Sequence, residues 1–308
     1  MPNKKDHPFK NTRMPLSQRV VFSFIRFTFK ILGVISPKLA GRLALRLFMT
    51  PTKFGTPRKE KALRESAVLK SINVRGRKIS VRTWGKADAP AVLLSHGWGG
   101  RATQFHAFIT PLVDAGYKVI GFDLPAHGDS EGSYTNMMDA ALVISEVAKQ
   151  EGEQKGEKEA EFEAIIGHSF GTGTALLAMD KYDVRAKKLV LIAYFSDVIW
   201  ITNLFGEMFD LSDSTLDAMR QIALVKFKDT FDISWNWADI SPTHTIKSIQ
   251  AELLLIHDEK DHEVPYSQAK PLQTLVPQAQ IMTTSGYGHR KILMHKKVVE
   301  RVLAFIHG

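Results

Sequence analysis

The segment Gly167-His168-Ser169-Phe170-Gly171 constrains the fold of this chain more than any other stretch of its sequence. It follows an apolar run at 164–166 and precedes a helix-like run at 174–179. A strand, a Gly-x-Ser-x-Gly turn and a helix, in this order, are typical of a sharp turn that exposes a nucleophilic serine. Glycine is needed at both ends because a side chain there would collide with the neighbouring strand or helix. The pentapeptide can also arise by chance, so the rest of the chain has to supply further evidence.

Short apolar runs alternate with helix-like stretches from about residue 69 onward. Strands are predicted near Val74 and at 79–82, 91–94, 118–122, 164–166, 189–193, 253–256 and 281–282. Helices are predicted at 103–116, 137–148, 174–179 and 291–306, and the charged run 151–161 is expected to be a helix end and a loop. Strands that alternate with helices in this way indicate an α/β fold with a mostly parallel sheet flanked by helices on both faces.

The net charge of +9 suggests a nucleic-acid partner until the charges are located. Residues 1–55 hold 11 Lys and Arg against one acidic residue, which leaves 30 basic and 31 acidic residues in 56–308. The body of the chain is therefore almost neutral. It contains no basic strip with interleaved aromatics, so we expect no nucleic-acid partner.

No residue pattern predicts a metal or a cofactor. The chain has no Cys, which excludes disulfides and Cys-ligated metals and favours a reducing compartment, although a Cys-free chain could also be exported. No His-Glu-x-x-His segment occurs, and His106, His257 and His262 would bind a metal only if they converge in space. The glycines at 97–100 lack the Gly-Lys-Ser/Thr ending of a phosphate loop. We therefore expect no metal, no cofactor and a cytoplasmic location.

The basic N-terminal segment predicts two amphipathic helices joined at Pro37. Arg19, Arg26 and Lys30 repeat at helical spacing through an apolar run, and three further basic residues repeat every four positions after the proline. The run is too short and too charged for a transmembrane helix. It also fits a signal peptide badly, because charges interrupt the apolar core and no small-residue cleavage site follows.

Two interpretations of this N-terminal segment remain open from the sequence. In one, residues 14–50 make a peripheral contact with an anionic membrane surface, at its inner face. In the other, the helices dock on the rest of the protein and their charges face water. We treat 1–60 as an N-terminal helical extension and 61–308 as the main domain, with an insertion at about 196–245.

The candidate partners of Ser169 each follow a predicted strand of their own. Asp261 comes after the strand at 253–256, and His289 comes after the strand near 281–284. The turn Ser95-His96-Gly97-Trp98 follows the strand at 91–94, and we assign the oxyanion-binding N–H groups to Trp98 and Phe170. Catalytic groups of an open α/β sheet collect at the carboxyl ends of its strands, and the order Ser, Asp, His is the one expected there.

With these motifs, residues 70–308 resemble the α/β-hydrolase fold superfamily. The stretch 122–132 is similar to the family's Asp-x-Pro-Gly-His-Gly-x-Ser loop, with Ala126 where Gly is usual, a departure expected to affect only loop geometry. The resemblance implies that Asp261 is the acid of the triad. Asp258 in the same segment and Asp197 after the preceding strand remain alternatives. His96, His127 and His168 are expected to hold loops rather than to act on substrate.

The resemblance also implies that the insertion is a helical cap over the pocket. It is rich in apolar side chains, and we expect some of them to face the pocket and the rest to form a core of the cap itself. The members of this set are Trp200, Phe205, Met208, Phe209, Met219, Phe227, Phe231, Trp235 and Trp237.

These residues predict a serine hydrolase that cleaves small-molecule carboxylic esters with apolar acyl groups through an acyl-enzyme on Ser169. A Ser nucleophile argues against the haloalkane dehalogenase and epoxide hydrolase branches of the family, which have Asp at that position. Thioester, amide and carbon–carbon bond hydrolysis and perhydrolysis remain open on the same residues. A non-catalytic, membrane-associated binding protein on the same fold also remains open. The sequence does not fix the substrate or the oligomeric state.

Overall fold

The computed structural model describes residues 16–156, 160–231 and 235–308, which form two compact units. The first, the helical unit, combines the described residues up to Thr50 with Asp197–Ser241. The second, the sheet unit, combines Pro51–Ser196 with Pro242–Gly308. Ser169, Asp261, His289 and the two oxyanion candidates all belong to the sheet unit.

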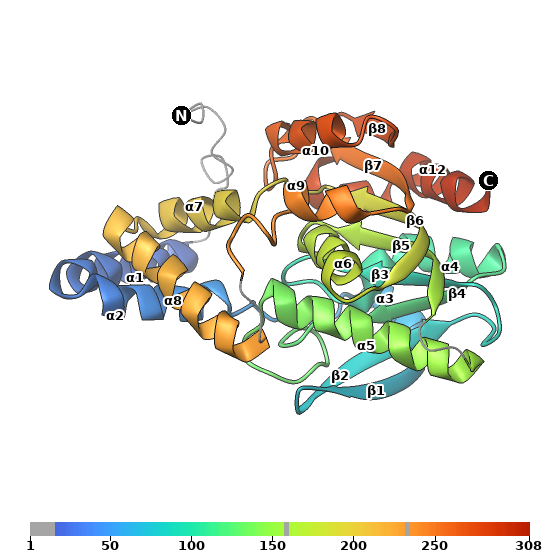
Figure 1. Ribbon diagram of the computed structural model, residues 1–308, viewed down its shortest axis with the longest axis horizontal. Coiled ribbons are helices and arrows are strands. Elements are labelled where there is room, and N and C mark those ends of the chain that lie inside the picture. The colour runs from blue at the N-terminus through green and yellow to red at the C-terminus, as the bar shows by residue number, and fades with distance from the viewer. Residues whose placement is uncertain (1–15, 157–159, 232–234) are drawn as a thin grey trace. The chain divides into compact units, whose positions relative to one another are not determined.

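The sheet unit is organised by a sheet whose eight strands, counted within the described residues, run in the order β1-β2-β4-β3-β5-β6-β7-β8 (Figure 1). β1 and β2 form an antiparallel hairpin and β2 pairs antiparallel with β4, whereas all other neighbours are parallel. The α/β fold class predicted from the sequence is thus confirmed. The strands are β1 (Val68–Val74), β2 (Arg77–Trp84), β3 (Ala91–Ser95), β4 (Lys118–Phe122), β5 (Glu161–His168), β6 (Arg185–Ile192), β7 (Glu252–Asp258) and β8 (Gln280–Thr284).

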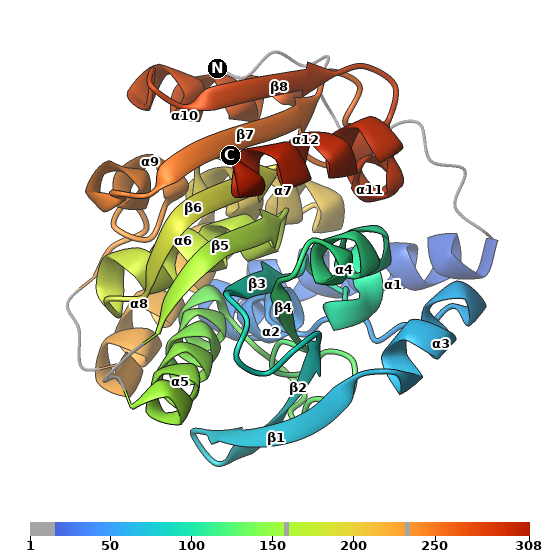
Figure 2. The same cartoon turned by 90° about the vertical axis from the view of Figure 1, so that its right-hand side faces the viewer.

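Helices cover both faces of this sheet (Figure 2). On one face α4 (His106–Asp114) and α12 (Lys296–His307) bury Phe108, Leu112, Val298 and Val302 against strand residues such as Val92. α5 (Met137–Lys155) and α6 (Phe170–Lys181) lie on the other face. Burial on both faces explains why the central strands read as continuous apolar runs. The remaining helices of the unit are α3 (Arg58–Glu65), α9 (Pro242–Thr245), α10 (Ala269–Leu275) and α11 (Gly288–Lys291).

The predicted helices have different limits in the structure, and the one predicted at 174–179 is α6, which begins at Phe170 and ends at Lys181. The stretch predicted at 103–116 begins as a 3-10 turn, Ala102–Phe105, before α4. α5 continues past 148 to Lys155 and ends where Gly156 adopts a left-handed φ of 74°. The run 151–161, predicted as a helix end and a loop, therefore begins with the end of α5, and its residues 157–159 lie outside the described residues.

The single helix predicted at 291–306 was wrong, because the segment is divided in three. α11 and a 3-10 turn, Ile292–Met294, precede α12, and His295 between them is extended with φ −82° and ψ 123°. The ring of His295 stacks on Tyr287 with centroids 3.5 Å apart. This break leaves the segment around His289 as a short separate helix next to the end of β8.

The helical unit joins the N-terminal helices to the insertion. It contains α1 (Leu16–Ile35), α2 (Pro37–Phe48), α7 (Val198–Phe209) and α8 (Asp213–Phe231). Ser36 ends the first helix and caps the second by accepting a hydrogen bond from the Leu39 N–H over 3.3 Å. Pro37 follows at the first helical position, where a missing N–H costs nothing. The predicted pair of helices joined at this proline is confirmed.

Aromatic side chains of the insertion form much of the core of this unit. Phe209 stacks on Phe22 with ring centroids 5.4 Å apart, and Phe205 meets Phe48 edge-on at 5.2 Å. Met219 is completely buried. These side chains of the insertion therefore pack on the N-terminal helices, and the prediction that others face a pocket stays a prediction. No described helix has the length and apolar character needed to cross a bilayer.

Candidate active site

Ser169 lies on the turn between β5 and α6, in a conformation that is unusual for a residue with a side chain. Its φ is 53° and its ψ is −121°. Such angles cost energy and persist only where the surrounding structure enforces them. Here the Ser169 N–H donates to the carbonyl oxygen of Ile192 at the end of β6, over 2.9 Å. The serine is half-buried, so its side chain stands partly open at the carboxyl end of the sheet.

The two glycines of the pentapeptide are required by close backbone approach, as the sequence predicted. A Cβ on Gly167 would lie 2.8 Å from the carbonyl oxygen of Gly171, closer than real Cβ atoms come. A Cβ on Gly171 would overlap the carbonyl group of Ser95 at the end of β3. The turn Gly167–Gly171, which we call the elbow, is therefore packed tightly between its own helix α6 and the neighbouring strand β3. This packing fixes the position of Ser169.

Asp261 and His289 form a buried hydrogen-bonded pair after β7 and β8. The Oδ2 atom of Asp261 lies 2.7 Å from Nδ1 of His289. The Oδ1 atom accepts the backbone N–H groups of Glu263 and Val264 over 2.8 and 2.9 Å, so the carboxylate cannot rotate freely. A proton on Nδ1 that is held by this carboxylate leaves Nε2 of His289 as the basic nitrogen.

The two alternative acids are engaged elsewhere. Asp258 accepts hydrogen bonds from the Thr284 hydroxyl over 2.7 Å and from the amides of Gly286 and Tyr287, and so organises the loop after β8. Burial alone raises the pKa of Asp258, but these hydrogen bonds outweigh it and leave the pKa below its ordinary value. Asp197 caps α7 in the helical unit by accepting the Ile199 N–H over 2.8 Å. Asp261 is therefore the one of the three that contacts His289.

The turn after β3 lies directly against Ser169. A Cβ on Gly97 would sit 3.1 Å from the Cβ of Ser169, and the Gly97 carbonyl accepts the Gly100 N–H over 2.9 Å, which closes the turn. The Trp98 ring packs edge-on against Phe170 with centroids 5.1 Å apart. Phe170 is the first residue of α6, where a backbone N–H has no partner within the helix. Across the described part of the chain, neither the Trp98 nor the Phe170 N–H donates to another group.

His96 and His127 hold the loops next to this turn, as expected. Nδ1 of His96 donates to the Gly97 carbonyl over 2.8 Å and Nε2 accepts the Leu124 N–H over 3.0 Å. Burial lowers the pKa of His96 to about 4. Burial and the neighbouring His96 lower the pKa of His127 to about 3. Both rings are therefore neutral near pH 7 and act as hydrogen-bonding spacers.

The loop after β4 explains the family's preference for glycine at position 126. Ala126 has a φ of 65°, in the left-handed region that glycine adopts without strain. The loop closes nevertheless, because Asp123 accepts the amides of Ala102 and Asp129 over 2.8 and 2.9 Å. The substitution of Ala for Gly thus affects local backbone strain and leaves the loop's hydrogen bonds in place.

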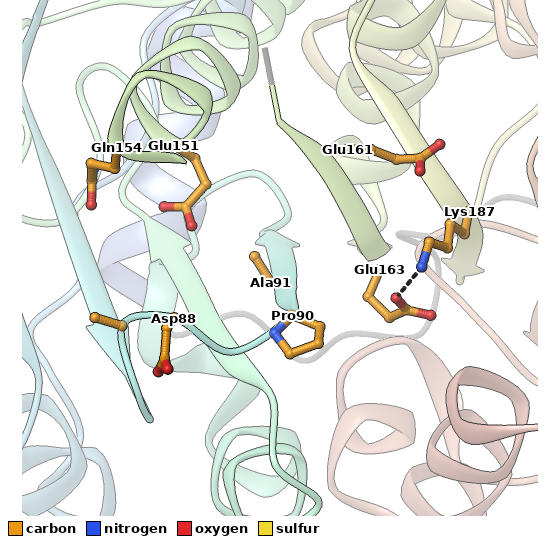
Figure 3. Close-up of a pocket in the computed structure, with 9 residues that line it drawn as sticks. Asp88, Pro90, Ala91, Glu151, Gln154, Glu161, Glu163 and Lys187 are labelled. Carbon is orange, nitrogen blue, oxygen red and sulfur yellow. Dashed lines mark hydrogen bonds and ion pairs between the residues drawn. The ribbon is translucent and has the colours of Figure 1, made fainter. Parts of the chain in front are cut away.

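A cavity of about 740 Å³ lies at the opposite ends of the strands, around the amino ends of β3, β5 and β6 (Figure 3). Its lining is rich in carboxylates, among them Asp88, Glu161 and Glu163, and Lys187 pairs with Glu163 over 2.8 Å. Ser169 follows the far end of β5, so this cavity is separate from the candidate site. Among the described residues no group of three or more His, Asp and Glu side chains could hold a metal ion.

The fold and the site together define a protein of the α/β-hydrolase class. A mostly parallel sheet carries the serine elbow, the His–Asp pair and the turn with Trp98 at the carboxyl ends of its strands. The model of the alpha/beta hydrolase family matches residues 92–302, and the chain belongs to this family.

Individual relatives are more distant. The chain is 26% identical over 226 residues to the lysophosphatidylserine lipase ABHD12 of Danio rerio, covering 68% of this chain and 56% of the relative. It is 22% identical over 270 residues to the bifunctional esterase/perhydrolase DCH of Acinetobacter calcoaceticus, covering 74% and 95%. The esterase PF2001 of Pyrococcus furiosus has a similar fold, with a TM-score of 0.61, 21% identity and coverage of 84% and 96%. The matches to the first three curated relatives span 32–56% of their length.

Proposed function

We propose that this protein is a serine hydrolase that cleaves carboxylic esters through an acyl-enzyme on Ser169. The observation that carries the proposal is the 2.7 Å contact between Asp261 and Nδ1 of His289, in the loop next to the serine elbow. Ester-cleaving relatives, the lipase and the esterase/perhydrolase described above, support the same reaction class.

The proposed mechanism uses residues of the sheet unit alone. Nε2 of His289 takes the Ser169 hydroxyl proton as the serine oxygen attacks the ester carbonyl. The N–H groups of Trp98 and Phe170 stabilise the negative oxygen of the tetrahedral intermediate. The protonated His289, oriented by Asp261, then gives its proton to the leaving alkoxide. A water molecule, deprotonated by the same histidine, then attacks the acyl carbonyl, and the histidine gives this proton to the Ser169 oxygen as the carboxylic acid is released.

Covalent labelling separates this proposal from the non-catalytic alternative. A fluorophosphonate probe should label wild-type protein at Ser169, with the modified peptide identified by mass spectrometry. The Ser169→Ala variant should not be labelled, whereas a Ser71→Ala control, which changes an exposed serine on β1, should be labelled like the wild type. Absence of labelling in folded wild-type protein would overturn the proposal and favour a binding protein.

The acyl preference is proposed from the apolar insertion and is tested separately. A p-nitrophenyl ester series from acetate to palmitate should show the highest kcat/KM at medium or longer chains. Highest activity on acetate with none above butyrate would contradict the apolar acyl preference while leaving the ester hydrolase proposal intact. Faster turnover of the matching acyl thioester would identify a thioesterase on the same triad.

A further inference from the structure

The outer face of the first helix carries an apolar stripe that folding leaves uncovered. Of the 17 large apolar side chains exposed in the described part of the chain, nine lie between residues 20 and 43. Five of those on α1 follow one another at spacings of four and three residues, which places them on one line along the helix. Their exposed fractions range from 45% to 85%. We call this set the outer stripe: Val20, Phe24, Phe27, Ile31 and Val34.

The opposite face of α1 is already packed within the helical unit. Phe22 and Phe29 both meet the ring of Phe209, with centroids 5.4 and 6.2 Å apart. A Cβ on Gly33 would come within 3.1 Å of the Thr215 hydroxyl, so the first helix runs close to α8. Because the inner face supplies the packing, the outer stripe is not explained by the stability of the unit. Exposed apolar surface of this extent on a folded protein marks an interaction site.

Basic side chains accompany the outer stripe. Arg19, Arg26 and Lys30 form a second line beside it on α1, and Lys38, Arg42 and Arg46 continue on α2 (blue in Figure 1). All six are exposed, and residues 16–50 contain no acidic residue. Arg26 also donates to the Met208 carbonyl over 2.9 Å. Among the described residues no carboxylate pairs with Arg19, Lys30, Lys38 or Arg42.

We propose that the outer stripe docks on an anionic phospholipid surface with the axis of α1 in the membrane plane. The apolar side chains would enter the boundary between headgroups and acyl chains, and the basic residues would meet the lipid phosphates. A second copy of the chain is a poorer partner, because a symmetric contact through the stripe brings two rims of like charge together. The proposal is independent of the ester hydrolase function.

Vesicle binding by the full-length chain tests the proposal. The protein carries Ser169→Ala so that lipid hydrolysis cannot change the vesicles, and co-sedimentation compares phosphatidylcholine alone with a phosphatidylcholine–phosphatidylglycerol mixture. We expect binding to the anionic vesicles that weakens with added salt. Phe24→Ser with Phe27→Ser should lower the partition coefficient at least tenfold. Arg19→Gln with Lys30→Gln should lower it about 25-fold on anionic vesicles, at roughly fivefold per charge.

Matched controls change exposed residues elsewhere. Leu69→Ser with Val225→Ser removes apolar surface, and Lys70→Gln with Lys86→Gln removes charge, and both double variants should bind as well as the parent. Circular dichroism melting verifies that all variants fold. Equal binding to both vesicle types, or binding that the stripe variants do not weaken, would overturn the proposal. Absence of binding to either vesicle type would also overturn it. In that case, a dimer in sedimentation velocity that dissociates in the Phe24→Ser with Phe27→Ser variant would identify self-association as the role of the stripe.

Discussion

The side chain of His168 is bonded to the backbone of His289, which lies 121 positions further along the chain. Nε2 of His168 donates to the His289 carbonyl oxygen over 2.8 Å, and the two rings lie 4.9 Å apart between centroids. Burial lowers the pKa of His168 well below its ordinary value, and the nearby His289 lowers it further. Because His168 directly precedes Ser169, the elbow itself holds the segment that carries the proposed general base.

We predict that His168 acts as a positioning residue for His289. His168→Ala should lower kcat/KM about 10- to 100-fold, since a displacement of about 1 Å in a catalytic group has effects of this size. His168→Gln keeps an N–H donor at a similar distance and should recover most of the activity. The measurements are kcat/KM on a p-nitrophenyl ester, the rate of fluorophosphonate labelling, and the melting temperature. Equal impairment of the two variants would contradict the positioning role.

The second prediction concerns Asp261, the proposed acid of the triad. Asp261→Asn should lower kcat on the order of 10⁴-fold, because an amide in place of the carboxylate favours the wrong tautomer of the histidine. The free energy of unfolding should be affected less strongly than kcat, because the Asn side-chain oxygen can still accept the Glu263 and Val264 N–H groups. Steady-state kinetics and a chemical denaturation curve for the same preparation measure both effects.

Asp258→Asn provides the matched comparison to this variant. Asp258 accepts hydrogen bonds from Thr284 and Tyr287 through one oxygen and from Gly286 and Lys260 through the other. An amide has one accepting oxygen, so the unfolding free energy should fall by about 1–3 kcal/mol. Its kcat should remain far above that of Asp261→Asn. If instead Asp258→Asn loses turnover by orders of magnitude and Asp261→Asn does not, the assignment of the acid is wrong.

Sequence patterns predicted the sheet well because strands buried on both faces give continuous apolar runs, and the strand predicted at 118–122 coincides with β4. The elbow was predictable because only glycine fits where Gly171 meets Ser95. What the sequence could not give are contacts across long separations. Nothing near position 168 indicates that its ring bonds to the carbonyl of His289. The family resemblance favoured Asp261 over Asp258, but the direction in which each carboxylate points is visible only in the structure.

The N-terminal helices show a different limit of sequence patterns. The basic and apolar repeats predicted two amphipathic helices, but an apolar face that packs and one that is exposed look alike in sequence. The structure separates them: Phe22 and Phe29 face Phe209, whereas Phe24 and Phe27 are 70% and 61% exposed. The first helix therefore has apolar residues on two sides. Only the side with Phe22 and Phe29 packs against other described residues of the helical unit.

The third prediction tests the packing of the elbow. Gly171→Ala places a methyl group against the Ser95 carbonyl, where backbone on both sides prevents relaxation. We expect a loss of about 3 kcal/mol in the free energy of unfolding, the upper end of the usual range for overpacking. Gly55→Ala is the control, because a Cβ there meets nothing within 4 Å. Urea denaturation of both variants measures the effect, and equal stability of the two would show that the elbow is not tightly wedged.

The fourth prediction concerns stability against pH and follows from the buried neutral histidines. Burial lowers the pKa of His96 to about 4, whereas an unfolded histidine titrates near about 6.5. Between these values the unfolded chain binds a proton that the folded chain does not. The unfolding free energy should therefore be highest above about pH 6.5 and fall as the pH decreases toward 4, by about 2 kcal/mol at pH 5 for this histidine. His127, whose pKa burial and His96 lower to about 3, adds to the fall in the same direction.

Denaturant unfolding at a series of pH values from 7.5 to about 5 measures this dependence. His127→Gln should flatten the slope, because an amide does not titrate and can still donate to the Pro125 carbonyl that Nδ1 of His127 contacts at 3.0 Å. His307→Gln changes an exposed histidine at the chain end and should leave the slope unchanged. A stability that stays constant or rises between pH 6.5 and 5 would show that these rings are protonated in the folded protein. The hydrogen bonds that connect the turn after β3 to the loop after β4 would then need a different assignment.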